Sequence, residues 1–84
     1  MSEANKRFGQ RVRELRRARG MSQENLSFAA GVHRTYLGSI ERGERNPTLK
    51  NIALIAKAIG VSLAQLFAYD NRHSEAGQEA GPTI

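Results

Sequence analysis

The stretch QENLSFAAGVHRTYLGSIER, residues 23–42, decides the fold of this 84-residue chain. Apolar side chains recur in it at helical spacing on both sides of Gly31: Leu26, Ala30, Val32, Leu37 and Ile40. Glycine adopts positive φ at little cost, so Gly31 is the position where one short helix ends and the chain turns into the next. The spacing predicts two short helices held at a steep angle by a tight turn.

The second of these helices, residues 34–42, has two different faces. On a wheel of about 100° per residue, Tyr36, Leu37 and Ile40 gather on one side. The opposite side carries polar, basic or small residues: Arg34, Thr35, Gly38, Ser39 and Arg42. We expect this second side to face outward, because a helix with hydrogen-bonding and basic side chains suits the major groove of DNA.

Several linked segments resemble the Cro/CI-type (XRE) helix-turn-helix transcription regulators. They are FGQRVRELRRARG (8–20), SQENL (22–26), RTYLGSIERGERNPTL (34–49) and IAKAIGVSLAQLF (55–67). Within that family, RTYLGSIERGERNP (34–47) is most similar to the controller proteins of restriction-modification systems. The resemblance implies an all-α fold, a compact five-helix bundle of the lambda-repressor-like DNA-binding type with a helix-turn-helix.

The rest of the chain is consistent with such a bundle. A first helix is expected over residues 2–19, and a fourth helix is expected to begin after Thr48 and to end at Gly60. The inward stripe of the fourth helix is predicted to be Leu49, Ile52, Ala53, Ala56 and Ile59. Ser62 and Gln65 form a capping box for a fifth helix. We expect a DNA-binding domain at residues 1–69 and a flexible tail at residues 70–84.

The net charge of +5 is unevenly distributed along the chain. Residues 1–69 hold 12 Lys and Arg against five Asp and Glu, so the expected domain is basic. A basic domain favours nucleic acid or an anionic membrane surface, and a solvated charged surface is the other interpretation. The chain has no cysteine, no apolar run of membrane-spanning length and no signal segment, so we expect a soluble cytoplasmic protein.

The resemblance assigns roles to the outer face of residues 34–42. Arg34, Thr35 and Ser39 occupy the base-reading positions of the family, and the wheel independently places them outward. Arginine can pair with guanine O6 and N7, and threonine can contact a thymine methyl group. Tyr36 has two interpretations, since its ring can complete the core and its hydroxyl can reach DNA, as the likeness to controller proteins implies.

Phosphate contacts are expected on both sides of this helix. Gln23 stands at a helix N-terminus, where free N–H groups attract a phosphate, and the family uses a glutamine there as a backbone clamp. Arg42, Arg45 and Asn46 border the exit loop, where a phosphate backbone would pass, although a polar surface turn is the ordinary alternative. His33 would cap the helix, a position for which histidine is poorly suited.

Two further sets of residues receive structural roles. The resemblance implies a buried ion pair between Arg16 and Glu41 that joins the first helix to the third. A subunit contact is expected from apolar residues late in the chain: Leu54, Leu66, Phe67 and Tyr69.

The expected function is sequence-specific binding of double-stranded DNA by a homodimer on a pseudo-palindromic operator, with the helix 34–42 in the major groove. An antitoxin or adaptor module whose main role is to bind a protein partner is the alternative. An enzyme is not expected, because the sequence offers no nucleophile–base pair, metal-ligand set or phosphate loop. We expect no cofactor, no metal, no membrane partner and no small-molecule ligand.

Overall fold

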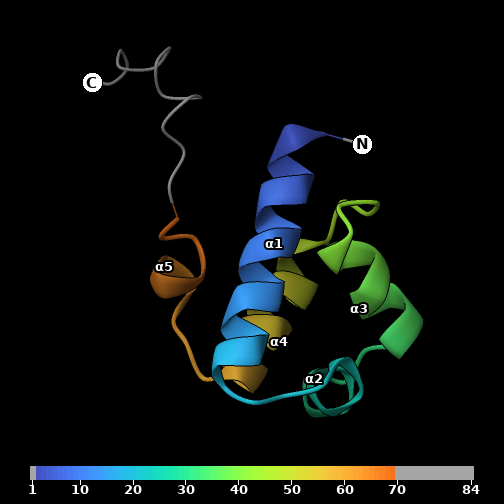
Figure 1. Cartoon of the computed structure of the whole chain (residues 1–84), viewed down its shortest axis with the longest axis vertical. Helices are drawn as coiled ribbons and strands as arrows, with labels where there is room; N and C mark the ends of the chain where they lie inside the picture. Colours follow the sequence, from blue (N-terminus) through green and yellow to red (C-terminus); the bar gives the residue numbers. More distant parts are fainter. Residues whose placement is uncertain (1, 70–84) are drawn as a thin grey trace.

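The computed structural model describes residues 2–69, which form an all-helical bundle (Figure 1). Its helices are α1 (Glu3–Ala18), α2 (Gln23–Ala30), α3 (Arg34–Glu41), α4 (Leu49–Ile59) and α5 (Leu63–Leu66). The predicted five-helix fold is therefore confirmed. Residue 1 and the tail expected at residues 70–84 lie outside the described residues.

Short polar side chains begin four of these helices. Ser2, Ser22, Thr48 and Ser62 each accept a hydrogen bond from the backbone N–H three residues later, at 2.9 to 3.1 Å. Each cap pairs one of the N–H groups that a helix start otherwise leaves unsatisfied. The exception is α3, because His33 makes no such bond.

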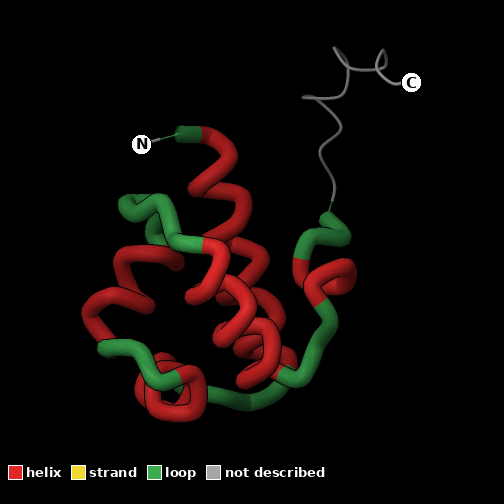
Figure 2. Tube along the Cα trace, turned by 180° about the vertical axis from the view of Figure 1, so that it is seen from behind, coloured by secondary structure: helices red, strands yellow, loops and turns green. Residues whose placement is uncertain are grey.

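The helices enclose one core. α1 packs against α3, α2 packs against α3 and α4, and the short α5 closes against α1 and α4. Every helix contributes buried apolar side chains: Phe8, Val12, Leu26, Ala30, Leu37, Ile40, Ile55, Ala56, Ile59 and Leu66. Figures 1 and 2 place α3 and α5 on opposite sides of α1. The helix-turn-helix is therefore separated from the last helix by the body of the bundle.

Two glycines permit close approaches of the backbone, one in the turn between α2 and α3 and one where α1 crosses α3. Gly31 ends α2 with φ 75°, the left-handed conformation predicted for the turn. Gly9 is buried where α1 crosses α3, and a Cβ atom there would lie only 2.7 Å from the backbone oxygen of Glu41. A side chain at position 9 would therefore push the two helices apart.

The inward stripe predicted for the fourth helix is partly wrong. Leu49 is 72% exposed and Ala53 is exposed, whereas Ile55 is fully buried. The stripe that faces the bundle follows Ile52, Ile55, Ala56 and Ile59. The buried face is turned toward Ile55 because α4 is covered by both α2 and α5, and a helical wheel of α4 alone does not contain these neighbours.

No helix within residues 2–69 combines the length and the apolar character needed to cross a bilayer.

Candidate nucleic-acid interface

The first turn of α3 presents polar side chains to solvent. Arg34 and Thr35 are exposed, and the guanidinium of Arg34 has no hydrogen-bond partner within residues 2–69. Beside them lies a hollow of about 230 Å³, lined by Gln23, Arg34, Thr35, Gly38 and Arg42. Apart from the glycine, the lining side chains offer amide, hydroxyl and guanidinium groups, which can bond to phosphate oxygens and base edges.

Gly38 keeps the floor of this hollow open. A Cβ atom on Gly38 would lie 3.3 Å from Arg42 Nη1 and 3.6 Å from Gln23 Oε1. The glycine thus lets two long polar side chains, one from α2 and one from the end of α3, approach each other over the helix. A glycine inside a helix lowers the stability of that helix by about 0.5 to 1 kcal/mol relative to alanine.

Ser39 does not lie on the outer face, so the outward position that the wheel predicted for it is wrong. The residue is 7% exposed, and its hydroxyl donates a hydrogen bond to the Tyr36 carbonyl at 2.7 Å. Its own carbonyl accepts from the N–H of Glu44 in the loop that follows α3. The wheel treats α3 as an isolated cylinder, whereas the exit loop folds back over the second half of the helix.

The side chain of Gln23 is held in place by a residue of α3. Its side-chain Nε2 donates to Glu41 Oε1 at 2.9 Å, so the amide at the start of α2 is tied to the last residue of α3. Oε1 of Gln23 remains on the side of Gly38 and the hollow. This bond fixes the orientation of the Gln23 amide, and the phosphate contact expected at this position stays a prediction.

Glu41 is the centre of a buried polar cluster. Its Oε2 accepts from Arg16 Nε at 2.7 Å, its Oε1 accepts from Arg16 Nη2 at 3.0 Å, and Arg13 Nε lies 3.4 Å from Oε1. Burial by itself raises the pKa of Glu41, but the hydrogen bonds from Arg16 and Gln23 outweigh it, so the pKa lies below its usual range. The structure thus brings together the two residues expected to join α1 to α3.

The exit loop carries charged side chains that are already paired with neighbours. Arg42 donates through Nε and Nη2 to the two carboxylate oxygens of Glu44, at 3.0 and 3.1 Å. These hydrogen bonds raise the pKa of Arg42 and lower that of Glu44. The guanidinium of Arg45 lies 5.5 Å from the centre of the Tyr36 ring, and Asn46 is exposed. All three predicted phosphate-binding residues of this region are therefore accessible.

For Tyr36 the structure supports the interpretation that the ring completes the core, whereas a contact of its hydroxyl with DNA stays a prediction. Its ring is half-buried and packs against the core, while its hydroxyl accepts a hydrogen bond from Asn51 Nδ2 of α4 at 2.9 Å. Asn51 could not be predicted as a partner of Tyr36 from the sequence, because the contact joins residues from two different helices.

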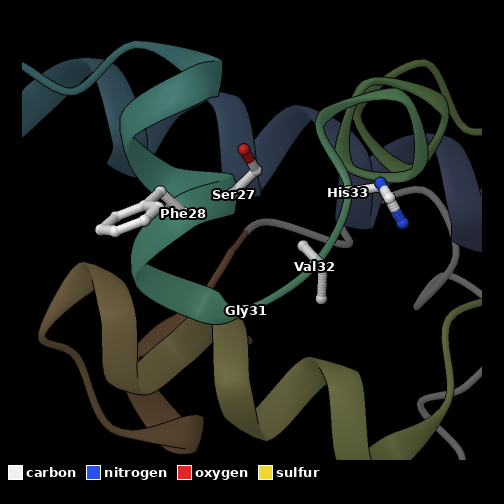
Figure 3. A pocket seen from close by; sticks show the side chains of 5 residues that line it. All are labelled: Ser27, Phe28, Gly31, Val32 and His33. Carbon is white, nitrogen blue, oxygen red and sulfur yellow. The ribbon is translucent and has the colours of Figure 1, made fainter.

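A second hollow lies beside the turn between α2 and α3. It measures about 400 Å³ and is lined by Ser27, Phe28, Gly31, Val32 and His33 (Figure 3). Phe28 projects from α2 and is 89% exposed, which is unusual for a phenylalanine in a small domain. Ser27, by contrast, is buried and its hydroxyl donates to the Glu24 carbonyl.

The four residues predicted for the subunit contact differ in how exposed they are. Leu66 is fully buried in the core and cannot contact a partner, because α5 turns this side chain toward α1 and α4. Phe67 is 45% exposed, stacks on Phe8 with ring centres 5.5 Å apart, and lies 6.4 Å from the Tyr69 ring. Leu54 is half-buried against the core. Of the four residues, Phe67 offers the most accessible apolar surface.

Two arginines outside the candidate interface have structural partners that the sequence did not indicate. Arg11 donates to the carbonyls of Gln65 and Leu66, and Arg19 donates to the carbonyl of Ile59 at 2.9 Å. Both side chains therefore bond to carbonyl groups near the ends of α5 and α4, which lack partners inside their own helices. Arg17, in contrast, is exposed.

Comparison with known proteins identifies close relatives of this arrangement. The sequence model of a helix-turn-helix family matches residues 12–66. The chain is 49% identical over 63 residues to control protein C.BamHI of Bacillus amyloliquefaciens, a match that covers 74% of this chain and 78% of that protein.

Solved structures give the same result. The fold matches the restriction-modification controller protein C.AhdI from Aeromonas hydrophila with a TM-score of 0.77 and 47% identity, over 79% of this chain and 100% of that one. It also matches the controller protein C.Esp1396I, solved as a tetramer in complex with its natural 35 base-pair operator, with a TM-score of 0.76 and 34% identity over 80% of this chain and 88% of that one.

Proposed function

We infer that this chain, which belongs to the Cro/CI-type (XRE) helix-turn-helix family of DNA-binding transcription regulators, binds one specific DNA sequence. We propose that it does so as a dimer on a pseudo-palindromic operator. The observation that carries this proposal is the pair of exposed side chains, Arg34 and Thr35, on the first turn of α3 beside the hollow that Gln23 borders. In helix-turn-helix proteins the N-terminal residues of the second helix contact base edges in the major groove.

In this proposal the side chains divide into two groups. Arg34 and Thr35 read base edges, and a good bidentate contact is worth about 1 to 3 kcal/mol of discrimination. The others bind phosphates and so set the position of α3 in the groove: Gln23, Arg42, Arg45 and Asn46. The buried hydroxyl of Ser39 has no place in either group.

A dimer binds DNA with a higher affinity than one recognition helix can provide. A single α3 spans only a few base pairs, and two copies on half-sites about one helical turn apart give useful affinity. The exposed ring of Phe67, together with Tyr69, is the surface that we assign to the subunit contact. Because α5 and α3 lie on opposite sides of α1, a contact through α5 leaves both recognition helices uncovered (Figure 2).

Selection of binding sites from random duplexes tests the proposal. Wild-type protein should recover one motif with two inverted halves, and Arg34→Ala should reduce the preference for that motif over random DNA by about tenfold or more. Arg17→Ala is the matched control, since it removes one exposed arginine of α1 and should leave the preference unchanged. Recovery of no motif, or equal preferences in wild type and Arg34→Ala, would refute the proposed reading of DNA.

A further inference from the structure

Glu44 places a carboxylate beside the candidate interface. The residue lies in the exit loop after α3, and its backbone N–H donates to the Ser39 carbonyl at 2.9 Å. Gly43 before it has φ 78°, so the chain turns back over the end of α3 as in a Schellman motif. The backbone therefore holds Glu44 next to Arg42, one of the residues that line the hollow.

The carboxylate of Glu44 occupies one edge of the Arg42 guanidinium. Nε and Nη2 of Arg42 donate to the two carboxylate oxygens at 3.0 and 3.1 Å, so the pair is bidentate. Arginine binds two oxygens of a phosphate through the same kind of parallel hydrogen bonds. Nη1 lies toward Gly38, on the side of the hollow. A DNA phosphate that approaches the paired edge therefore meets a carboxylate already in its place.

The pair is weak enough for DNA to break it. The Arg42 and Glu44 side chains are 53% and 46% exposed, and solvent screens such an ion pair, so it contributes little to ordering the arginine. Its effect on charge is larger, because the carboxylate cancels the charge that the arginine brings to the interface. Affinity for DNA depends on how many phosphates the protein neutralises, through the counterions that are released. The loss of this charge therefore outweighs the benefit of a preordered arginine.

We propose that Glu44 competes with DNA phosphate for Arg42 and so lowers the affinity of the protein for every duplex, whatever its sequence. The inference rests on the phosphate contact that the proposed function gives to Arg42, and it adds an acidic residue that opposes this contact. On binding, Arg42 exchanges the carboxylate of Glu44 for a phosphate, and the released carboxylate stays close to the DNA backbone. Glu44 thereby limits the occupancy of unrelated DNA, with a matching loss of affinity for the operator.

Glu44→Gln tests the competition with little change in shape. Glutamine keeps the length of the side chain and the backbone hydrogen bond to Ser39, but it carries no charge. The measurement is the affinity for the selected duplex and for a shuffled duplex of the same length, at several salt concentrations. Glu44→Gln should raise both affinities about fivefold at about 0.1 M salt, and it should steepen the slope of log affinity against log salt by up to about one unit. An unchanged thermal unfolding midpoint checks that the fold is kept.

A double-variant cycle with Arg42→Ala separates this competition from simple repulsion between Glu44 and DNA. Repulsion between the carboxylate and the phosphates acts whether or not Arg42 is present, whereas the release of Arg42 requires the arginine. Glu44→Gln should therefore raise the affinity about fivefold in the wild-type background and only about twofold in the Arg42→Ala background.

Glu14→Gln is the matched control for charge. Glu14 is also an exposed carboxylate that pairs with an arginine, Arg11, at 3.3 Å, but it lies on α1 in a hollow shared with Tyr69. This variant should change the affinity by no more than about twofold, because salt screens distant charges.

Three results would overturn the inference. Lower affinity in Glu44→Gln would mean that Glu44 holds Arg42 in place for DNA. Equal gains in the wild-type and Arg42→Ala backgrounds would assign the effect to repulsion alone, and equal gains in Glu44→Gln and Glu14→Gln would assign it to net charge. A wild-type protein that binds the selected and shuffled duplexes equally would instead refute the proposed function, and the competition for phosphate would still be measurable on both.

Discussion

Arg16 and Glu41 form a buried ion pair, with Arg16 Nε 2.7 Å from Glu41 Oε2, that joins α1 to the last residue of α3. Arg16 also donates through Nη1 to the Met21 carbonyl at 2.8 Å, in the connection that leads to α2. Glu41 in turn accepts from Gln23, the first residue of α2. One carboxylate therefore fixes the relative positions of α1, α2 and α3, the three elements that shape the candidate interface.

Replacement of Arg16 by alanine should destabilise the fold by about 3 to 5 kcal/mol, because Glu41 would remain buried without its principal partner. Urea unfolding measures this loss, and DNA binding should fall only in proportion to the unfolded fraction. Arg17→Ala, at an exposed neighbouring position, should stay within about 0.5 kcal/mol of wild type. An Arg16→Ala protein as stable as wild type would show that the pair contributes little.

Stability should depend on pH through Glu41, whose pKa is lowered in the folded protein. Above the unfolded-state pKa of about 4.3 the carboxylate is charged in both states and its full contribution is present. As the pH falls below that value, the unfolded state takes up the proton first, so stability is lost down to the lower folded-state pKa.

Urea unfolding between about pH 7 and about pH 3 measures this loss. Glu41→Gln should lose part of the pH dependence, whereas Glu44→Gln should change it far less, because the Glu44 carboxylate is exposed and its pair with Arg42 is screened by solvent. Equal slopes in wild type and Glu41→Gln would contradict the assignment.

Gly38→Ala should raise the stability of the fold and lower the affinity for DNA. The nearest atoms to an added Cβ are the ends of the Arg42 and Gln23 side chains, which can move, so the helix should gain about 0.5 to 1 kcal/mol. DNA affinity should nevertheless fall, because the methyl group enters the hollow and displaces the end of the Arg42 side chain. In Gly9→Ala the added atom meets α3 backbone, so that variant should lose stability. Thermal unfolding and duplex titration together distinguish the two glycines.

Arg45→Ala should weaken binding to all duplexes by a similar factor. We assign Arg45 to a phosphate, and loss of one phosphate contact reduces the slope of log affinity against log salt by about one. Titrations of the selected and the shuffled duplex at several salt concentrations measure this slope. A loss confined to the selected duplex would instead place Arg45 among the base-reading residues.

Phe67→Arg should reduce dimerisation, because it places a charge in the exposed apolar surface assigned to the subunit contact. Sedimentation at micromolar concentration should find more monomer than in wild type. Phe28→Arg is the matched control, since Phe28 is even more exposed but lies on α2, away from α5. The assignment fails if the two variants sediment alike.

The sequence by itself determined the order of the helices, their caps and the turn at Gly31. Caps and turns depend on residues three or four positions apart, so their chemistry can be read along the chain. The same local rules placed Arg34 and Thr35 on an exposed first turn. The family resemblance added the partnership of Arg16 with Glu41, which no local rule contains.

Only the tertiary structure decided which side of each helix is covered. Ser39 and Leu66 are buried, and Leu49 is exposed, because the exit loop and the neighbouring helices meet faces that a helical wheel cannot identify. The contacts of Gln23 with Glu41 and of Tyr36 with Asn51 likewise join residues from different helices. The physical reason is that burial and side-chain hydrogen bonds depend on the partner element, and periodicity along one helix does not identify that partner.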